Sequence, residues 1–268
     1  MTKSIRLTLS LLALLLAHPL HADVAQTLQS SMIWSPAAPV GTQAYVAFRK
    51  EFNLADVPAG PAMLHLFADS RYMLWVNGSQ ILRGPSRFNP KGPEYDSLDI
   101  QPYLQTGANS LVVLVHHYAG ATSGRIMSHA PGLTVLLEAD GQEILRSDTS
   151  WKSSNSTEYR PSPDAWSSIP DVIDARLSPG AWTTTDFDDT AWTAATPVDG
   201  STWGALQARH TPLTKETELT GVKRLPGGEA VSSLLPIDLI PTSAPKTYAG
   251  GYSGHWLWSS AAASNVWF

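Results

Sequence analysis

Hydrophobic and polar residues alternate with a period of two along much of the chain. The alternation is clear over Tyr45–Phe52 and recurs over Ala62–Ala68 and Tyr72–Val76, and Gly, Pro or Asn residues follow each run. Leu111–Val115 is continuously apolar, which is typical of a strand buried on both faces. An apolar stripe with helical spacing never extends beyond one or two turns. The pattern therefore predicts short strands rather than long helices.

Two dipeptides predict how neighbouring strands are joined. Asn77-Gly78 precedes Gln80–Leu82, and Asp140-Gly141 lies between Leu133–Leu137 and Glu143–Arg146. Asn-Gly and Asp-Gly suit two-residue hairpin turns because both positions tolerate a positive φ. Strands that recur at this spacing predict an all-β fold, an antiparallel β-sandwich.

The first 22 residues have the pattern of a signal peptide. Lys3 and Arg6 precede the apolar stretch Leu7–Ala17, and Ala22 is a small residue directly before Asp23. The apolar stretch is shorter than the roughly 20 residues that span a bilayer. We therefore expect cleavage near Ala22, a periplasmic or secreted location, and no membrane insertion after cleavage.

Composition excludes several classes of function. The 268 residues carry a formal net charge of −5 and contain no run of Lys or Arg, so a nucleic-acid groove has no electrostatic support. The absence of Cys excludes disulfides, thiolate metal sites and a cysteine nucleophile. Ten Trp residues suit either stacking on sugar rings or packing in the core of a β-sandwich.

Three regions follow the signal peptide. We assign residues 30–215 to the sandwich, in which 148–198 form an irregular Trp-rich extension, and 216–254 to a linker containing one short apolar strand. Leu257–Ala262 repeats the Trp-Ser-Ala pattern of Ile33–Ala38, so 255–268 are predicted to begin a second, truncated sandwich repeat. Chance similarity over a few positions is the alternative.

Six motifs carry a resemblance to a known family: Ala68–Gly78, Arg83–Arg87, Tyr95–Ile100, Gly107–Leu111, Ile173–Arg176 and Phe187–Trp192. Together they resemble the N-terminal, non-catalytic region of bacterial α-L-rhamnosidases of glycoside hydrolase family 78, although Ile173 stands where the family pattern usually has Tyr. The resemblance covers about residues 30–215 and implies a galactose-binding-like fold, an antiparallel jelly-roll β-sandwich. It also implies that the catalytic carboxylates lie on a downstream helical barrel, which has no counterpart here.

A cluster of polar residues is the candidate carbohydrate site. Arginine forks and carboxylates can bind vicinal hydroxyls in a bidentate manner. A site of this kind would also need an aromatic platform, for which Trp75 and Tyr118 are candidates. The alternative is structural: an Arg–Asp pair that ties the loop to the sheet. The cluster consists of Arg83, Arg87, Tyr95, Asp96 and Asp99.

Other polar residues in these motifs have a local structural interpretation. Asp99 and Asn109 are turn formers whose side chains accept hydrogen bonds from nearby backbone N–H groups. Asp188 and Asp189 are expected to cap a short turn that places Trp192 in the core.

Metal ligation has little support in the sequence. The alternation of a strand puts His116 and His117 on opposite faces, and the remaining histidines lack ligand spacing, so we expect no zinc site. Calcium is the possible exception, with Asp69 or the pair Asp188 and Asp189 as ligands, although no calcium-loop motif is present. We predict no other cofactor.

The combined hypothesis is an exported accessory module of an α-L-rhamnosidase-like glycoside hydrolase that lacks the catalytic barrel. No pair of carboxylates is marked as catalytic, so we assign no catalytic residue. The expected partners are a plant or bacterial glycan carrying L-rhamnose and a catalytic domain of the same polypeptide. A stand-alone lectin-like protein and a purely structural module are the alternatives.

Overall fold

A computed structural model describes residues 23–38, 41–119, 128–161 and 171–214. It also describes two short strands, β16 (Lys246–Thr247) and β17 (Ser253–Gly254), which pair with each other. The chain divides into two units, residues 1–215 and 216–268. The predicted signal peptide, most of the predicted linker and the predicted second repeat lie outside the described residues. Within the described part of the chain, no helix is long and apolar enough to cross a membrane.

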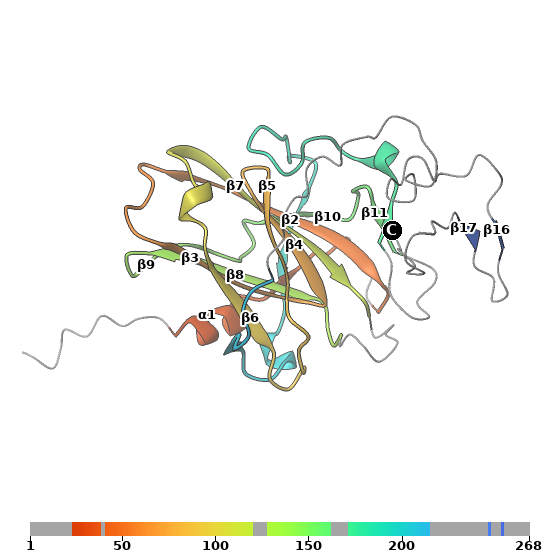
Figure 1. Ribbon diagram of the computed structural model, residues 1–268, viewed down its shortest axis with the longest axis horizontal. Helices are drawn as coiled ribbons and strands as arrows, with labels where there is room; N and C mark the ends of the chain where they lie inside the picture. Colours follow the sequence, from red (N-terminus) through yellow and green to blue (C-terminus); the bar gives the residue numbers. More distant parts are fainter. Residues whose placement is uncertain are drawn as a thin grey trace, which may run out of the picture. The chain divides into compact units, whose positions relative to one another are not determined.

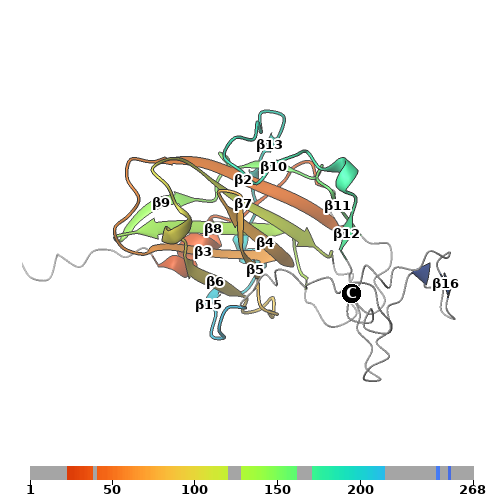
Figure 2. The same cartoon turned by 45° about the horizontal axis from the view of Figure 1, so that its top comes forward.

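The first unit is built from two packed β-sheets, one of six strands and one of seven (Figures 1 and 2). After β2 the chain passes back and forth between the two sheets, as in a jelly roll. The six-stranded sheet has the order β13 (Thr193–Ala194), β10 (Lys152–Ser154), β2 (Ala44–Leu54), β7 (Gly107–His117), β4 (Arg71–Val76) and β5 (Ser79–Gly84).

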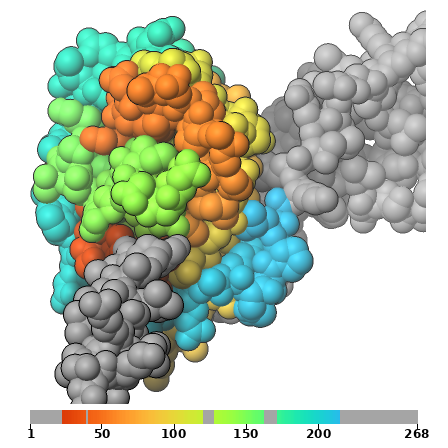
Figure 3. All heavy atoms as spheres, turned by 90° about the vertical axis from the view of Figure 1, so that its left-hand side faces the viewer, coloured from red at the N-terminus to blue at the C-terminus, as the bar shows by residue number. Residues whose placement is uncertain are grey.

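The seven-stranded sheet forms the second layer. Its strands pair in antiparallel fashion except at one edge, where β15 (Gln207–Ala208) runs parallel to β6 (Glu94–Asp99). In the space-filling view, the blue atoms near the end of the first unit pack against yellow ones (Figure 3). The order is β14 (Thr196–Pro197), β1 (Ile33–Trp34), β8 (Gly132–Ala139), β3 (Ala62–Asp69), β6 (Glu94–Asp99) and β15 (Gln207–Ala208), with β9 (Gln142–Arg146) paired to β8.

The core lies between the sheets and follows the period of two in the sequence. On β2, Val46 and Phe48 face inward and are fully buried, as are Val113 and Val115 on β7. The other sheet contributes alternate residues of β3 and β8. This arrangement confirms the predicted all-β sandwich, because the residues that alternate in the sequence line the buried face of each strand.

The strands and turns predicted from alternation are present. Each strand predicted in the sandwich lies within β2, β3, β4, β5, β7, β8 or β9, whereas the apolar strand predicted in the linker lies outside the described residues. Asn77 and Gly78 have φ of 49° and 83°, and Asp140 and Gly141 have φ of 52° and 71°. Positive φ at both central residues is what a type I′ hairpin requires, so both predicted hairpins are confirmed.

The outer face of the seven-stranded sheet carries a short helix that the strand pattern did not predict. Helix α1 (Val24–Ser30) begins at Asp23, whose side chain accepts a hydrogen bond from the backbone N–H of Ala25. Its Leu28 packs with Phe67 and Trp203 in a second buried cluster. With only 7 residues, α1 is too short to show helical periodicity and forms because its apolar face is buried on the sheet.

The Trp-rich extension covers part of the outer face of the six-stranded sheet. Trp182 and Trp192 are almost fully buried, and the Trp182 ring packs 5.5 Å from the ring of Trp75. Asp188 accepts a hydrogen bond from the Thr190 backbone N–H at 2.9 Å, which confirms the predicted cap. The shorter elements of the unit are β11 (Tyr159–Arg160), β12 (Val172–Ile173), and three 3-10 helices, η1 (Gln101–Tyr103), η2 (Ala175–Leu177) and η3 (Gly200–Thr202).

Candidate functional site

Three rows of side chains cross the outer face of the six-stranded sheet. The strand register places Tyr45, His116 and Arg71 in one row. The second row contains Ala47, Leu114, Met73 and Arg83. The third contains Arg49, Val112 and Trp75.

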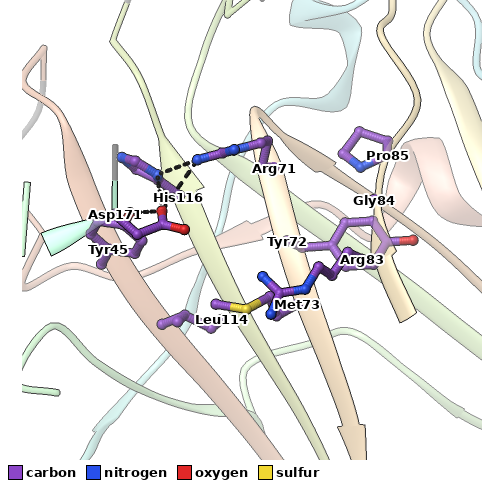
Figure 4. A pocket seen from close by; sticks show the side chains of 10 residues that line it. All are labelled: Tyr45, Arg71, Tyr72, Met73, Arg83, Gly84, Pro85, Leu114, His116 and Asp171. Atoms are coloured by element: carbon purple, nitrogen blue, oxygen red, sulfur yellow. Dashed lines mark hydrogen bonds and ion pairs between the residues drawn. The ribbon is translucent and has the colours of Figure 1, made fainter. Parts of the chain in front are cut away.

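The Trp-rich extension covers the third row. Residues of the first two rows line a pocket beside it. The pocket has a cavity volume of about 180 Å³, and Asp171, just before β12, closes one side of it. Met73 and Leu114 form an apolar base, and Arg71 and Arg83 project around it (Figure 4). This size suits one small polar molecule rather than an extended ligand, because drug-sized ligands occupy clefts of about 300 Å³ or more.

Asp171 connects the extension to the first row. Its Oδ1 accepts a hydrogen bond from Tyr45 Oη at 2.5 Å and one from Arg71 Nη2 at 3.3 Å. Arg71 Nη2 also lies 3.4 Å from His116 Nδ1. The Tyr45 and His116 rings stack with a centroid separation of 3.7 Å. These contacts fix the polar groups at the edge of the pocket before any ligand arrives.

Burial controls the charge of this group. It lowers the pKa of His116 to about 3, and the positive charge of Arg71 acts in the same direction. Burial also raises the pKa of Tyr45, and the hydrogen bond to Asp171 raises it further. At neutral pH, His116 is therefore an uncharged ring and Tyr45 a neutral hydroxyl donor. The permanent charges are those of Arg71, Arg83 and Asp171.

The structure separates the residues of the predicted carbohydrate cluster. Arg83 lines the pocket. Trp75 is buried and packs against Trp182, so its ring is not exposed as a platform for a sugar. Asp96 pairs with Leu66 across the sheet and points into the sandwich, where it accepts hydrogen bonds from Tyr72 Oη and, at 2.8 Å, from Arg209 Nη1.

The buried contacts of Asp96 match the structural alternative, an Arg–Asp pair, with Arg209 as the arginine. Both side chains are almost completely excluded from solvent. The pair ties the segment after β15 to β6 and leaves the Asp96 carboxylate no free oxygen for a sugar.

The remaining members of the cluster lie elsewhere. Tyr95 is nearly buried on the other sheet, with its ring 5.9 Å from that of His65. Arg87 is exposed in the connection between β5 and β6. Tyr118 is fully buried after β7, with the Arg71 guanidinium 5.2 Å from its ring centroid. None of these three lines the pocket, and their predicted contact with sugar remains a prediction.

Asp99 and Asn109 have the local contacts expected of turn formers. Asp99 Oδ1 accepts hydrogen bonds from the backbone N–H groups of Ala62 and Gln101, each at 2.9 Å. Asn109 Oδ1 accepts one from the Gln105 backbone N–H at 2.9 Å. The structural interpretation of both residues is confirmed.

The predicted calcium ligands are engaged with protein groups. Asp69 is fully buried and accepts hydrogen bonds from backbone N–H groups and from the indole of Trp203. Asp189 lies 3.4 Å from Arg49 Nη1. Over the described ranges, no group of three or more His, Asp or Glu side chains is arranged to hold a metal ion. His116 and His117 do lie on opposite faces, since His117 contacts the Trp34 ring inside the sandwich.

The sequence did not predict the group of linked polar side chains at the edge of the pocket, which consists of Tyr45, Arg71, His116 and Asp171. Strand alternation could have placed Tyr45 and His116 on outer faces, but their pairing depends on register. Asp171 is separated from Arg71 by 100 positions. No local signal connects them.

The fold and the pocket define a mostly antiparallel β-sandwich domain with a polar pocket over one sheet. The sequence profile of the α-L-rhamnosidase N-terminal domain matches residues 60–218. The chain therefore belongs to the family of α-L-rhamnosidase N-terminal domains.

Known relatives agree with this assignment. The chain is 28% identical over 180 residues to an α-L-rhamnosidase of Streptomyces avermitilis. The aligned segment covers 66% of this chain and 15% of the relative. A family GH78 rhamnosidase of Bacillus sp. GL1 superposes with a TM-score of 0.63 and 34% identity, over 69% of this chain and 20% of that one. An α-L-rhamnosidase from Aspergillus terreus superposes with a TM-score of 0.50 and 25% sequence identity. This match covers 63% of this chain and 21% of the Aspergillus chain. The chain thus spans about a fifth or less of the length of these relatives.

Proposed function

We propose that this chain is the accessory domain of an exported α-L-rhamnosidase-type glycoside hydrolase and that its pocket binds an L-rhamnosyl unit of a plant or bacterial glycan. In this proposal the hydrolytic step belongs to a catalytic domain of the same polypeptide. Family membership and the length of the relatives support the assignment to such an enzyme.

The observation that carries the carbohydrate role is the combination of groups at the pocket. Arg71 and Asp171 present a planar cation and a carboxylate beside an apolar base formed by Met73 and Leu114. The guanidinium and the carboxylate can form hydrogen bonds with two neighbouring hydroxyl groups of a sugar. L-Rhamnose is a 6-deoxy sugar, so its methyl group suits the apolar base.

Calorimetric titration of the full chain with L-rhamnose tests the binding proposal. We expect saturable heat with the wild type and at least tenfold weaker binding, about 1.4 kcal/mol, with Arg71→Gln. Arg146→Gln is the matched control, because Arg146 is an exposed arginine on β9 of the other sheet. Absence of heat with folded wild-type protein would exclude sugar binding by this chain.

A second sugar tests the role of the apolar base. L-Mannose differs from L-rhamnose by a hydroxyl group at C6. We expect it to bind about tenfold more weakly or worse, because the hydroxyl would lose its water against Met73 and Leu114. Equal affinity for the two sugars would show that the C6 group does not contact this base.

Export and partnership need separate tests. Intact-mass measurement on protein from the periplasm or medium should show removal of residues 1–22, and an uncleaved cytoplasmic chain would contradict export.

Sequencing the gene past the codon for Phe268 should reveal the catalytic domain. The 268-residue chain should not hydrolyse an aryl α-L-rhamnoside, and turnover by the purified chain would contradict the accessory role.

A further inference from the structure

A second hollow adjoins the pocket on the other side of Tyr45. It has a cavity volume of about 300 Å³, and Tyr45 lines both hollows. Gln43 and Asn155 provide amide groups at its wall, and Tyr159 provides a ring that lies 5.5 Å from that of Tyr45. The two hollows together are large enough for two linked sugar units.

Arg160 gives the second hollow its chemistry. Its Nη1 donates hydrogen bonds to the backbone carbonyls of Thr157 and, at 2.8 Å, of Tyr159. Among the described residues, nothing accepts a hydrogen bond from its Nε or Nη2, and no carboxylate forms an ion pair with it. The guanidinium is therefore held in place by Nη1, while its Nε and Nη2 have no acceptor in the part of the chain that the structure describes.

The carboxylates of the surrounding segments are already engaged. Asp174 accepts two hydrogen bonds from Arg176, at 2.8 and 2.7 Å. Asp171 is bound by Tyr45 and Arg71, and Glu158 accepts a hydrogen bond from the Trp182 indole. The charge of Asp174 also interacts with that of Arg160, but the hydrogen bonds described for this carboxylate come from Arg176 and not from Arg160.

We propose that the second hollow is a subsite for a sugar unit bearing a carboxylate, a uronate, linked to the unit in the first pocket. Arg160 would bind the carboxylate, and the amide oxygens of Gln43 and Asn155 would accept hydrogen bonds from ring hydroxyls. The amide nitrogens are already engaged, since Gln43 Nε2 lies 2.7 Å from His116 Nε2 and Asn155 Nδ2 donates to the Ala37 carbonyl at 3.3 Å. This inference rests on the proposed function, since it requires that the first pocket hold a sugar. It adds that the domain selects an acidic oligosaccharide rather than any rhamnoside.

The test compares two disaccharides in calorimetric titrations of the full chain. One is an L-rhamnosyl uronate, and the other is its carboxyl-reduced, neutral counterpart. We expect the acidic disaccharide to bind about tenfold more tightly, with the preference decreasing as salt concentration rises. Arg160→Gln should abolish the preference and leave the affinity for free L-rhamnose unchanged, and Arg146→Gln should change neither.

The outcomes separate the two proposals. Binding of L-rhamnose together with equal affinity for the two disaccharides would overturn the acidic subsite and leave the proposed function in place. Failure of all three sugars to bind folded protein would overturn the proposed function. If Arg160→Gln does not fold, Arg160→Lys keeps the charge but loses the fork, and an unchanged affinity for the acidic disaccharide in that variant would contradict bidentate recognition.

Discussion

Among single side chains, Asp69 shows how a buried charge can be stabilised entirely by its surroundings. Burial alone would raise the pKa of its carboxyl group. Hydrogen bonds from His117, Trp203 and the His129 backbone together outweigh this effect, so the pKa lies below its ordinary value. The side chain at the end of β3 thereby joins β7, the segment before β8 and the 3-10 helix η3. These contacts give the side chain a structural role, because they tie segments that are distant in the sequence to one buried carboxylate.

Replacement of Asp69 by Asn should destabilise the domain by about 2–3 kcal/mol at neutral pH, because it removes the charge that accepts these hydrogen bonds. The depressed pKa contributes stability above the unfolded-state pKa, and this contribution is lost as the pH falls through the folded-state value. Thermal unfolding should therefore show a difference between wild type and variant that shrinks in acid. Asp56→Asn, at an exposed turn position, is the control, and a pH-independent difference would contradict this account.

Gly84 is required for a different reason, which is lack of space. A Cβ at this position would overlap both Asp96 and Tyr72, the two side chains that bond to each other inside the sandwich. Gly84→Ala should cost about 1–3 kcal/mol of unfolding free energy in denaturant titrations. Gly92→Ala is the control, since its Cβ would have Gln207 Nε2 at 3.9 Å as its nearest neighbour. Equal stability of the two variants would mean that the buried pair can shift without cost.

At the level of strands and segments, Arg49 fastens the Trp-rich extension to β2. Its guanidinium is fully buried and donates hydrogen bonds to Glu51 at 2.6 Å and to the backbone carbonyl of Thr184 at 2.7 Å. Its Cζ lies 5.7 Å from the ring centroid of Phe187. Arg49 thus anchors the part of the extension around Thr184 and Phe187, in addition to the pairing of β10 with β2 and the packing of the aromatic residues.

Arg49→Met should release this extension, because methionine keeps much of the apolar stem but makes none of these hydrogen bonds. We expect a loss of about 3 kcal/mol and new chymotrypsin cleavage after Phe187 and Trp192. Lys50→Met is the control, because Lys50 on the same strand bonds to Ser150, whereas the extension residues that Arg49 contacts are Thr184, Phe187 and Asp189. Resistance to chymotrypsin in the Arg49 variant would show that aromatic packing alone holds the segment.

The sequence predicted the strands better than it predicted the site. Alternation and the two hairpin turns depend on neighbouring residues, so β2, β4 and the turn at Asn77 could be placed from local patterns. The pocket depends on register between strands and on Asp171, which reaches β2 and β4 from a distant segment. The predicted sugar site includes Asp96 because the sequence does not show which face of its strand a polar residue occupies.

The sandwich as a whole carries buried ionisable groups on both of its layers, which makes its stability sensitive to acid. His116 lies on the outer face of the six-stranded sheet, and burial lowers its pKa from 6.5 to about 3. Burial also lowers the pKa of His65 on the seven-stranded sheet, although Glu138 opposes this effect. Protonation of either ring therefore favours the unfolded chain.

The sign of the pH dependence follows from where each state binds its proton. Between the unfolded-state and folded-state pKa values of His116, the unfolded chain is protonated and the folded chain is not, so stability falls as the pH decreases. From about pH 7 to about pH 5 this residue should remove about 2 kcal/mol of unfolding free energy.

His116→Phe keeps a ring against Tyr45 and removes the titration, so urea unfolding at the two pH values should show a smaller loss for the variant than for the wild type. Tyr103→Phe, at an exposed position, is the control and should behave like the wild type. An equal loss in the wild type and in the His116 variant would place the acid sensitivity on other groups, with His65 and Asp69 the next to be replaced. A smaller loss in the variant would mean that the neutral imidazole beside Arg71 and Asp171 is maintained at the expense of stability in acid.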